Sequence, residues 1–112
     1  MKTLLPGTLE MLILETLRRG PLHGYAIAQH IQHTSEDVLQ IEEGSLYPAL
    51  RRLEDRAWVT SEWGLSENNR HAKFYKLTAT GRAQLRTGLS AWQQFVEAAS
   101  RALHTSASPR TA

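Results

Sequence analysis

A proline near the middle of the chain, Pro48, restricts the fold more than any other residue, because it lies inside a segment with helical periodicity. Proline has no N–H and its ring clashes with the preceding turn, so a helix through this segment must begin within about one turn before Pro48. Gly44 or Ser45 is the predicted N-cap. One face of the helix is then apolar and carries four residues: Leu46, Ala49, Leu50 and Leu53.

The opposite face of the same helix carries different side chains. Tyr47, Arg51 and Asp55 lie there together with Pro48. A purely solvated helix more often carries Glu and Lys pairs, whereas tyrosine hydroxyls, arginines and helix N-termini hold phosphates and reach the edges of bases. The pattern therefore favours a helix that reads DNA. A surface helix that is basic without such a function is the alternative from this segment alone.

Length and composition indicate one folding unit without cofactor chemistry. The 112 residues, of which 41% are hydrophobic, suffice for one domain and one additional element for association. The chain has no cysteine, which excludes disulfides and thiolate metal sites. No apolar run reaches the roughly eighteen residues that span a bilayer, and residues 1–5 do not resemble a signal peptide. We therefore expect a cytoplasmic protein with no membrane contact, no metal and no cofactor.

Charge is distributed unevenly along the chain. Residues 1–69 contain six Lys or Arg and ten Asp or Glu, which gives −4, whereas residues 70–112 contain seven basic residues and one acid, Glu97, which gives +6. A basic second half indicates an anionic partner. The acidic first half disfavours nonspecific coating of nucleic acid, so contacts with DNA are expected only at chosen elements. Uneven solvation of two faces is the alternative.

Two shorter helices are predicted before the helix that contains Pro48. Thr8 is the predicted N-cap of the first, which ends at the Gly20-Pro21 break. The second opens at residues 23–25 and closes near His33, and a short element is expected around residues 38–41. Three short helices with tight connections, the third with an outward arginine, are typical of a helix-turn-helix.

Two segments after the third helix, residues 58–63 and 73–77, are rich in β-branched and aromatic residues and are predicted to be strands. Residues 64–72 between them favour turns, so the strands form a hairpin that leans on the helices. Trp58 and Trp63 are interpreted as hairpin and core anchors. A hairpin at this place is a wing, and its basic residues Arg70, Lys73 and Lys76 lie beside the third helix, where phosphates would pass.

A long C-terminal helix is predicted from a Thr78 cap to about residue 103. The partner predicted for its apolar seam is the same helix of a second subunit, because the leading helices already satisfy one another. The alternative is an amphipathic helix packed on its own domain. Residues 1–78 then form the winged helix-turn-helix, 79–103 the dimerisation helix and 104–112 a disordered tail. The seam follows a heptad pattern, with Phe95 on its flank: Leu85, Leu89, Trp92, Val96, Ala99 and Leu103.

The sequence resembles the PadR-like winged helix-turn-helix transcriptional regulators of the short subfamily. The resemblance covers about residues 5–103 and implies a mainly α fold with a small β-hairpin, in which a winged helix-turn-helix precedes a C-terminal dimerisation helix. No single motif is decisive, but five in the family's order are highly specific. They are Leu22-His23-Gly24-Tyr25, the run from Gly44 to Leu50 with Leu53-Glu54, the run from Ser66 to Arg70 with Lys73-Phe74-Tyr75, Leu77-Thr78 with Gly81-Arg82, and Trp92.

Members of this family are dimeric repressors, and many release their DNA when a small aromatic or cationic ligand binds. The resemblance therefore implies a homodimer on double-stranded DNA, with an inverted-repeat operator. The implied DNA contacts are His23 and Tyr25 on phosphates, Ser45, Tyr47 and Arg51 in the major groove, and Arg70 and Lys73 along the backbone from the wing.

Two positions depart from the family pattern. Ala57 stands where the family usually has glycine, so the turn from the third helix into the strand is expected to be less sharp. His71 stands where close relatives often have a second arginine, so the affinity of the wing for DNA is expected to be weaker or pH-dependent.

An effector site is expected around Trp92 and Phe95. Trp92 lies on the seam, so a dimer could present two Trp92 rings across its axis, and paired aromatic faces can hold a flat or cationic ligand. PadR-like proteins use this region for effectors. The alternative is that Trp92 only fills the dimer core.

The sequence offers weaker support for two other functions. His30 and His33 share a helix face, but a third ligand at useful spacing, a phosphate-binding loop and a recognisable nucleophile are all lacking, so we do not expect an enzyme. A winged helix that binds only another protein is the alternative to DNA binding, and the acidic residues between 36 and 43 are its best support. The basic wing argues against it.

Overall fold

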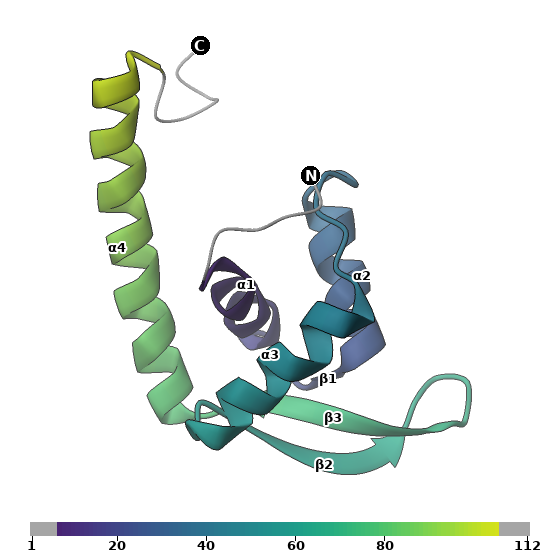
Figure 1. Ribbon diagram of the computed structural model, residues 1–112. Helices are drawn as coiled ribbons and strands as arrows, with labels where there is room; N and C mark the ends of the chain where they lie inside the picture. Colours follow the sequence, from purple (N-terminus) through teal and green to yellow (C-terminus); the bar gives the residue numbers. More distant parts are fainter. Residues whose placement is uncertain (1–6, 106–112) are drawn as a thin grey trace.

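The computed structural model describes residues 7–105 of the chain. It has four α-helices and three β-strands, with the hairpin turn reaching away from the helices and α4 extending away from the core (Figure 1). The predicted fold class, mainly α with a small β-hairpin, is confirmed. In chain order the elements are α1 (Thr8–Leu17), β1 (Leu22–His23), α2 (Gly24–Thr34), α3 (Glu43–Asp55), β2 (Val59–Leu65), β3 (His71–Leu77) and α4 (Ala79–Leu103).

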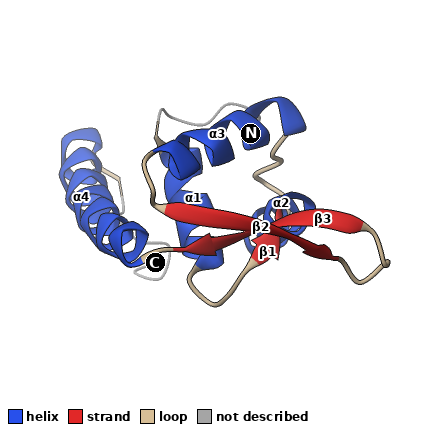
Figure 2. Cartoon of the chain, turned by 90° about the horizontal axis from the view of Figure 1, so that it is seen from below, coloured by secondary structure: helices blue, strands red, loops and turns tan. Residues whose placement is uncertain are grey.

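The core lies between α1, α2, α3 and the base of the hairpin, and α4 lies to one side of these elements (Figure 2). The predicted apolar face of α3 is confirmed, since all four of its residues are at most 1% exposed. Tyr47, Pro48, Arg51 and Asp55 are exposed on the other face, as predicted. The largest fully buried side chains are Ile13, Leu17, Ile27, Leu46, Leu50, Leu53 and Val59.

The start of α3 differs from the prediction. The helix begins at Glu43 with Glu42 as its N-cap, so neither Gly44 nor Ser45 is the cap. Pro48 is therefore the sixth helical residue, and its missing N–H leaves the Gly44 carbonyl without its usual partner in the helix. Because Gly44 is exposed, water can satisfy that carbonyl, and the helix begins slightly earlier than the proline rule predicts.

The sheet has one strand more than predicted and a longer hairpin. Strand order is β1-β3-β2, and β1 pairs with β3 through Leu22↔Tyr75 and His23↔Phe74. A strand of two residues is too short to show a period, so it could not be predicted from the local pattern. The hairpin pairs from Val59↔Leu77 to Leu65↔His71, which shortens the predicted loop 64–72 to the turn at residues 66–70.

Several local predictions are corrected. The N-cap of α1 is Gly7, at φ 82°, and Thr8 is the first helical residue. Residues 38–41 form no regular element, because the chain leaves α2 through two left-handed residues, Glu36 and Asp37. Trp58 is partly buried against the core as predicted, but Trp63 is 70% exposed and is not a core anchor.

The turn after α3 is as sharp as a glycine would make it, contrary to the expectation for Ala57. Ala57 adopts the left-handed conformation, with φ 61°. The N–H of Trp58 donates to the Leu53 carbonyl at 3.0 Å, and the N–H of Ala57 donates to the Glu54 carbonyl at 3.0 Å. These two bonds form the Schellman motif that closes many helices. The left-handed alanine costs about 1–2 kcal/mol relative to a glycine.

The long helix α4 begins and ends where it was predicted. The Thr78 hydroxyl accepts a hydrogen bond from the N–H of Gly81 at 3.0 Å, which confirms the cap. A Cβ on Gly81 would overlap the Trp58 carbonyl oxygen, so glycine is required where α4 meets the hairpin. At the other end, His104 and Thr105 close the helix through bonds to the carbonyls of Arg101 and Ser100. Residues 1–6 of the predicted domain and 106–112 of the predicted tail lie outside the described residues.

Within residues 7–105, none of the helices has the length and apolar character that crossing a membrane requires.

Candidate nucleic-acid interface

A cleft of about 750 Å³ opens between the start of α2, the outer face of α3 and the hairpin. Its walls come from three separate elements. We call it the α2–wing cleft. Five of the seven residues predicted to contact DNA line it: His23, Tyr25, Tyr47, Arg70 and Lys73.

His23 is held in place as the N-cap of α2. Its Nδ1 accepts a hydrogen bond from the N–H of Ala26 at 3.2 Å, and its ring meets Phe74 edge-on, with the ring centroids 5.4 Å apart. With Nδ1 used as an acceptor, Nε2 is the ring atom that can donate to an anion. This capping role orients the ring at the positive end of α2.

Tyr47 of α3 lies directly over the start of α2. A Cβ built on Gly24 would be 2.8 Å from the Tyr47 hydroxyl oxygen and 2.9 Å from its Cε1. Glycine is therefore required at residue 24 because the Tyr47 ring occupies the space of a side chain. Tyr25, the residue after Gly24, is exposed, and its hydroxyl accepts a hydrogen bond from the Gln29 side chain at 3.0 Å.

Ser45 and Arg51 are exposed on α3 but do not line the cleft. Among residues 7–105, Arg51 takes part in no ion pair, so its guanidinium is available to a ligand. It lies close enough to the cleft to act on Tyr75: burial raises the pKa of the Tyr75 phenol, Glu54 and Tyr47 raise it further, and Arg51 lowers it. A phenol whose pKa is raised stays neutral at physiological pH, so Tyr75 adds no negative charge to the cleft.

Lys73 already has a partner, whereas Arg70, the other predicted wing contact, takes part in no ion pair within residues 7–105. Its Nζ lies 3.6 Å from Glu54 Oε1 on α3 and 5.9 Å from the centre of the Tyr75 ring. The other oxygen of Glu54 accepts a hydrogen bond from the Ser61 hydroxyl at 2.5 Å. Glu54 thus ties both strands of the hairpin to the last turn of α3. Because the Lys73 pair is partly exposed, it contributes at most about 1 kcal/mol, and a phosphate can compete for the lysine.

Arg70, the last of the predicted DNA contacts, lies at the wing turn. Arg70 and His71 are exposed there, and both line the cleft together with the acidic Glu67. The weaker or pH-dependent wing expected from His71 stays a prediction. Trp63 also lines the cleft, and the sequence interpretation missed it because the strand pattern assigned the ring to the core.

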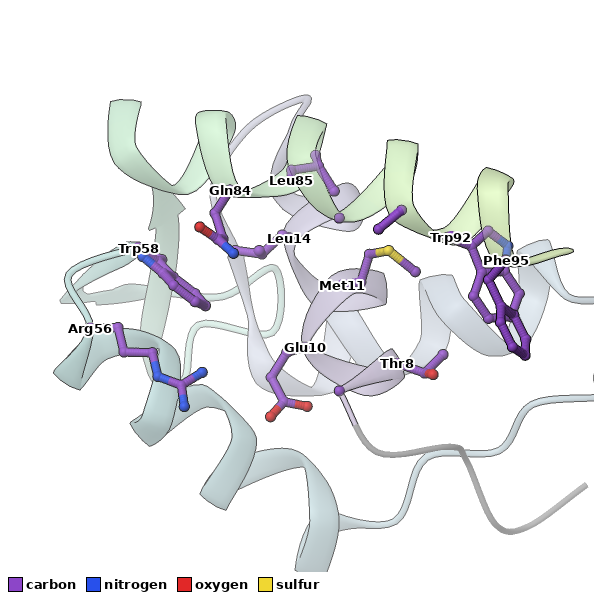
Figure 3. A pocket seen from close by; sticks show the side chains of 13 residues that line it. Thr8, Glu10, Met11, Leu14, Arg56, Trp58, Gln84, Leu85, Trp92 and Phe95 are labelled. Carbon is purple, nitrogen blue, oxygen red and sulfur yellow. The ribbon is translucent and has the colours of Figure 1, made fainter. Parts of the chain in front are cut away.

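A second groove, of about 410 Å³, lies between α1 and α4 (Figure 3). Met11 and Leu14 of α1 lie in its middle and Trp58 lies at one end. The two residues of the predicted effector site, Trp92 and Phe95, lie together at the other end. The centroids of their rings are 6.2 Å apart. The groove is called the α1–α4 groove below.

The seam of α4 divides into two parts. Leu85 is 3% exposed and belongs to the core of the chain itself, so its packing partner is not the one predicted. Farther along, Val96 and Ala99 are partly exposed, and three apolar seam residues remain accessible: Leu89, Trp92 and Leu103.

Metal ligands do not gather in the described part of the chain. No group of three or more His, Asp or Glu residues there could hold a metal ion.

Comparison with known proteins decides the family. The sequence matches the transcriptional regulator PadR-like family over residues 13–87. The chain belongs to this family. A PadR-family transcriptional regulator from Eggerthella lenta DSM 2243 has a similar structure, with a TM-score of 0.75 and 33% identity over 89% of this chain and 85% of that one.

A second PadR-family protein provides a comparison with DNA present. The crystal structure of Bacillus subtilis PadR in complex with operator DNA aligns with a TM-score of 0.66 and 28% identity, over 74% of this chain and 47% of that one. The negative transcriptional regulator PadR of Bacillus subtilis (strain 168) is 28% identical over 89 residues, which is 80% of this chain. The chain spans about half of that protein, 49% of its length.

The contact between Gly24 and Tyr47 predicts a coupled pair. Gly24→Ala should lower the free energy of unfolding by about 1–3 kcal/mol, because the new Cβ displaces the Tyr47 ring. In a Tyr47→Ala background the same change should be neutral or stabilising, since the space is vacant and alanine favours helix. Urea unfolding of the four proteins measures the coupling, and Gly44→Ala is the control because its Cβ would meet nothing within 4 Å. Additive effects would contradict the contact.

Proposed function

We propose that this PadR-like regulator is a sequence-specific DNA-binding protein that acts as a dimeric repressor. The observation that carries the proposal is the α2–wing cleft beside the unpaired Arg51, on the same fold as a PadR relative that holds operator DNA. The name of the Bacillus subtilis relative, a negative regulator, supports repression. Occupation of an operator by such a protein blocks access of other proteins to the same DNA.

Each element of the interface then has its own role. The outer face of α3 enters the major groove, where Arg51 reaches a base edge and Ser45 and Tyr47 contact the strand beside it. His23 and Tyr25 bind a phosphate at the start of α2, where the helix dipole favours an anion. Arg70 follows the backbone from the wing turn. Lys73 joins it when a phosphate replaces Glu54 as its partner.

A winged helix that binds only another protein is the competing function. Four acidic residues are exposed between α2 and the start of α3, namely Glu36, Asp37, Glu42 and Glu43. They lie outside the α2–wing cleft, whose lining includes both predicted basic contacts of the wing. DNA binding through phosphates weakens steeply with salt, whereas a largely apolar protein contact does not, so a salt titration separates the two functions.

Arg51 provides the first test of DNA reading. Arg51→Ala should cost about 1–3 kcal/mol of affinity for the operator and blur discrimination at one base pair. Arg52→Ala is the matched control, because Arg52 is the next residue of α3 but pairs with Glu10 of α1 at 3.1 Å. Binding assays on operator fragments, selected from genomic DNA by the purified protein, measure both effects. Unchanged affinity and sequence preference in Arg51→Ala would show that α3 does not read DNA through this residue.

The dimer is proposed from the apolar side chains that α4 leaves accessible. Leu89→Asp places a charge among Trp92 and Val96, and burying an unpaired carboxylate in an interface is costly, so the dimer should dissociate. Operator affinity should fall strongly, because the two half-sites are no longer linked. Gln94→Asp introduces the same charge on the exposed side of α4 and should leave the dimer intact. Sedimentation velocity at micromolar concentration decides, and a monomeric wild-type protein with tight operator binding would refute the proposal.

An effector is proposed at the α1–α4 groove, where Trp92 and Phe95 form an aromatic wall suited to a flat aromatic or a hydrophobic cation. A tenfold loss of operator affinity requires the ligand to bind the non-competent dimer about 1.4 kcal/mol more tightly. Titration of such compounds should quench tryptophan fluorescence and release DNA. Trp92→Leu should keep the dimer and DNA binding but lose the response, and a compound that still releases DNA from Trp92→Leu would exclude this site. DNA release is the deciding measurement, because Trp58 also lines the groove and can be quenched there.

A further inference from the structure

Trp63 is the most exposed of the three tryptophans, with 70% of its surface accessible. It lies on β2 opposite Lys73, on the same face of the hairpin as Val59 and Ser61. Val59 is buried at the base of the hairpin, but the hairpin continues beyond the helices, so Trp63 has no core to cover it. Its ring instead lines the α2–wing cleft.

The opposite wall of this cleft is also aromatic. Tyr25 and Tyr47 lie across from the hairpin, at the start of α2 and on α3. Polar groups surround these rings: Arg70, His71 and Glu67 at the wing turn, Lys73 opposite Trp63, and the positive end of α2 at Gly24. Aromatic walls between sites for anions match one strand of duplex DNA, in which apolar deoxyribose faces alternate with phosphates.

The two walls of the cleft are held at a fixed separation. A Cβ on Gly64, the neighbour of Trp63, would be 3.2 Å from the Phe74 ring, so this ring packs closely on β2. The same ring contacts the His23 ring that caps α2. Phe74 therefore connects the strand that carries Trp63 to the helix end that carries Tyr25. The cleft is preformed, which lowers the entropic cost of binding a ligand in it.

We propose that Trp63 packs its indole ring against the deoxyribose of the DNA strand that lies in the α2–wing cleft. This inference rests on the proposed function and adds to it an apolar contact that is independent of base sequence. The strand that passes from the major groove under α3 to the wing is the one that reaches the cleft. Trp63 lies two residues before the end of β2 and not at the turn, so its ring faces the side of that strand and does not enter the base stack.

Salt dependence distinguishes an apolar contact with DNA from an ionic one. Trp63→Ala should weaken binding about tenfold on operator and non-operator duplexes alike. The slope of log affinity against log salt concentration should stay unchanged, because no phosphate contact is lost. Trp63→Phe should recover most of the affinity. Leu65→Ala is the matched control, since Leu65 is 58% exposed on the same face of β2 but does not line the cleft, and it should bind DNA as the wild type does.

A second measurement needs no alanine variant. Acrylamide quenching of tryptophan fluorescence, compared between the wild type and Trp63→Phe with and without duplex DNA, reports the accessibility of Trp63. DNA should shield the signal that Trp63→Phe lacks. Shielding together with a tenfold loss at constant salt slope supports the inference.

The inference is overturned by equal affinity of Trp63→Ala and wild type or by a Trp63 signal that stays accessible in the complex. A flatter salt slope in Trp63→Ala would also overturn it, because it would mean that the wing had moved. Unwinding of closed circular DNA by the wild type but not by Trp63→Ala would also overturn it, in favour of insertion between bases. A wild-type protein that binds no duplex refutes the proposed function itself. Normal wild-type binding with no Trp63 effect refutes only this inference.

Discussion

The burial of one face of α3 is the constraint on which the rest of the structure depends. Its four apolar residues are at most 1% exposed, so the helix has a single rotational setting against α1, α2 and the hairpin. That setting turns Arg51 towards solvent and lays the Tyr47 ring over the start of α2. The same packing requires glycine at residue 24, because any larger residue would push the Tyr47 ring away. One packed face thus decides which side chains of α3 and α2 are presented together.

The hairpin depends on α3 through polar contacts. Glu54 accepts a hydrogen bond from Ser61 on β2 and pairs with Lys73 on β3, so the angle between wing and helix is set by a carboxylate at the end of α3. These contacts hold the wing in a defined place. Opening the Lys73–Glu54 pair costs little free energy, because the pair is partly solvated. The wing is therefore held in place before any ligand binds, and Lys73 can still leave Glu54 for a phosphate.

The helix α4 has two environments along its length. Near its start, Leu85 enters the core, and a Cβ built on Gly88 would be 3.5 Å from the Met11 sulfur. Farther along, Leu89, Trp92 and Leu103 are accessible. The α1–α4 groove lies at the change between them and is also lined by Arg56 and Trp58, where the chain leaves α3. A ligand in this groove would therefore contact both the proposed dimer helix and the exit of α3, which is a physical route for coupling between them.

The sequence by itself determined the features that depend on neighbours within one or two turns. The buried face of α3, the Thr78 cap, the hairpin and the length of α4 follow from helical spacing, capping and strand composition, which are local. Tertiary structure alone decided the strand β1, the pairing of Lys73 with Glu54, the burial of Leu85 within its protomer and the exposure of Trp63. Each of these depends on which distant segment lies alongside, and side-chain periodicity shows that a face is apolar without showing what covers it.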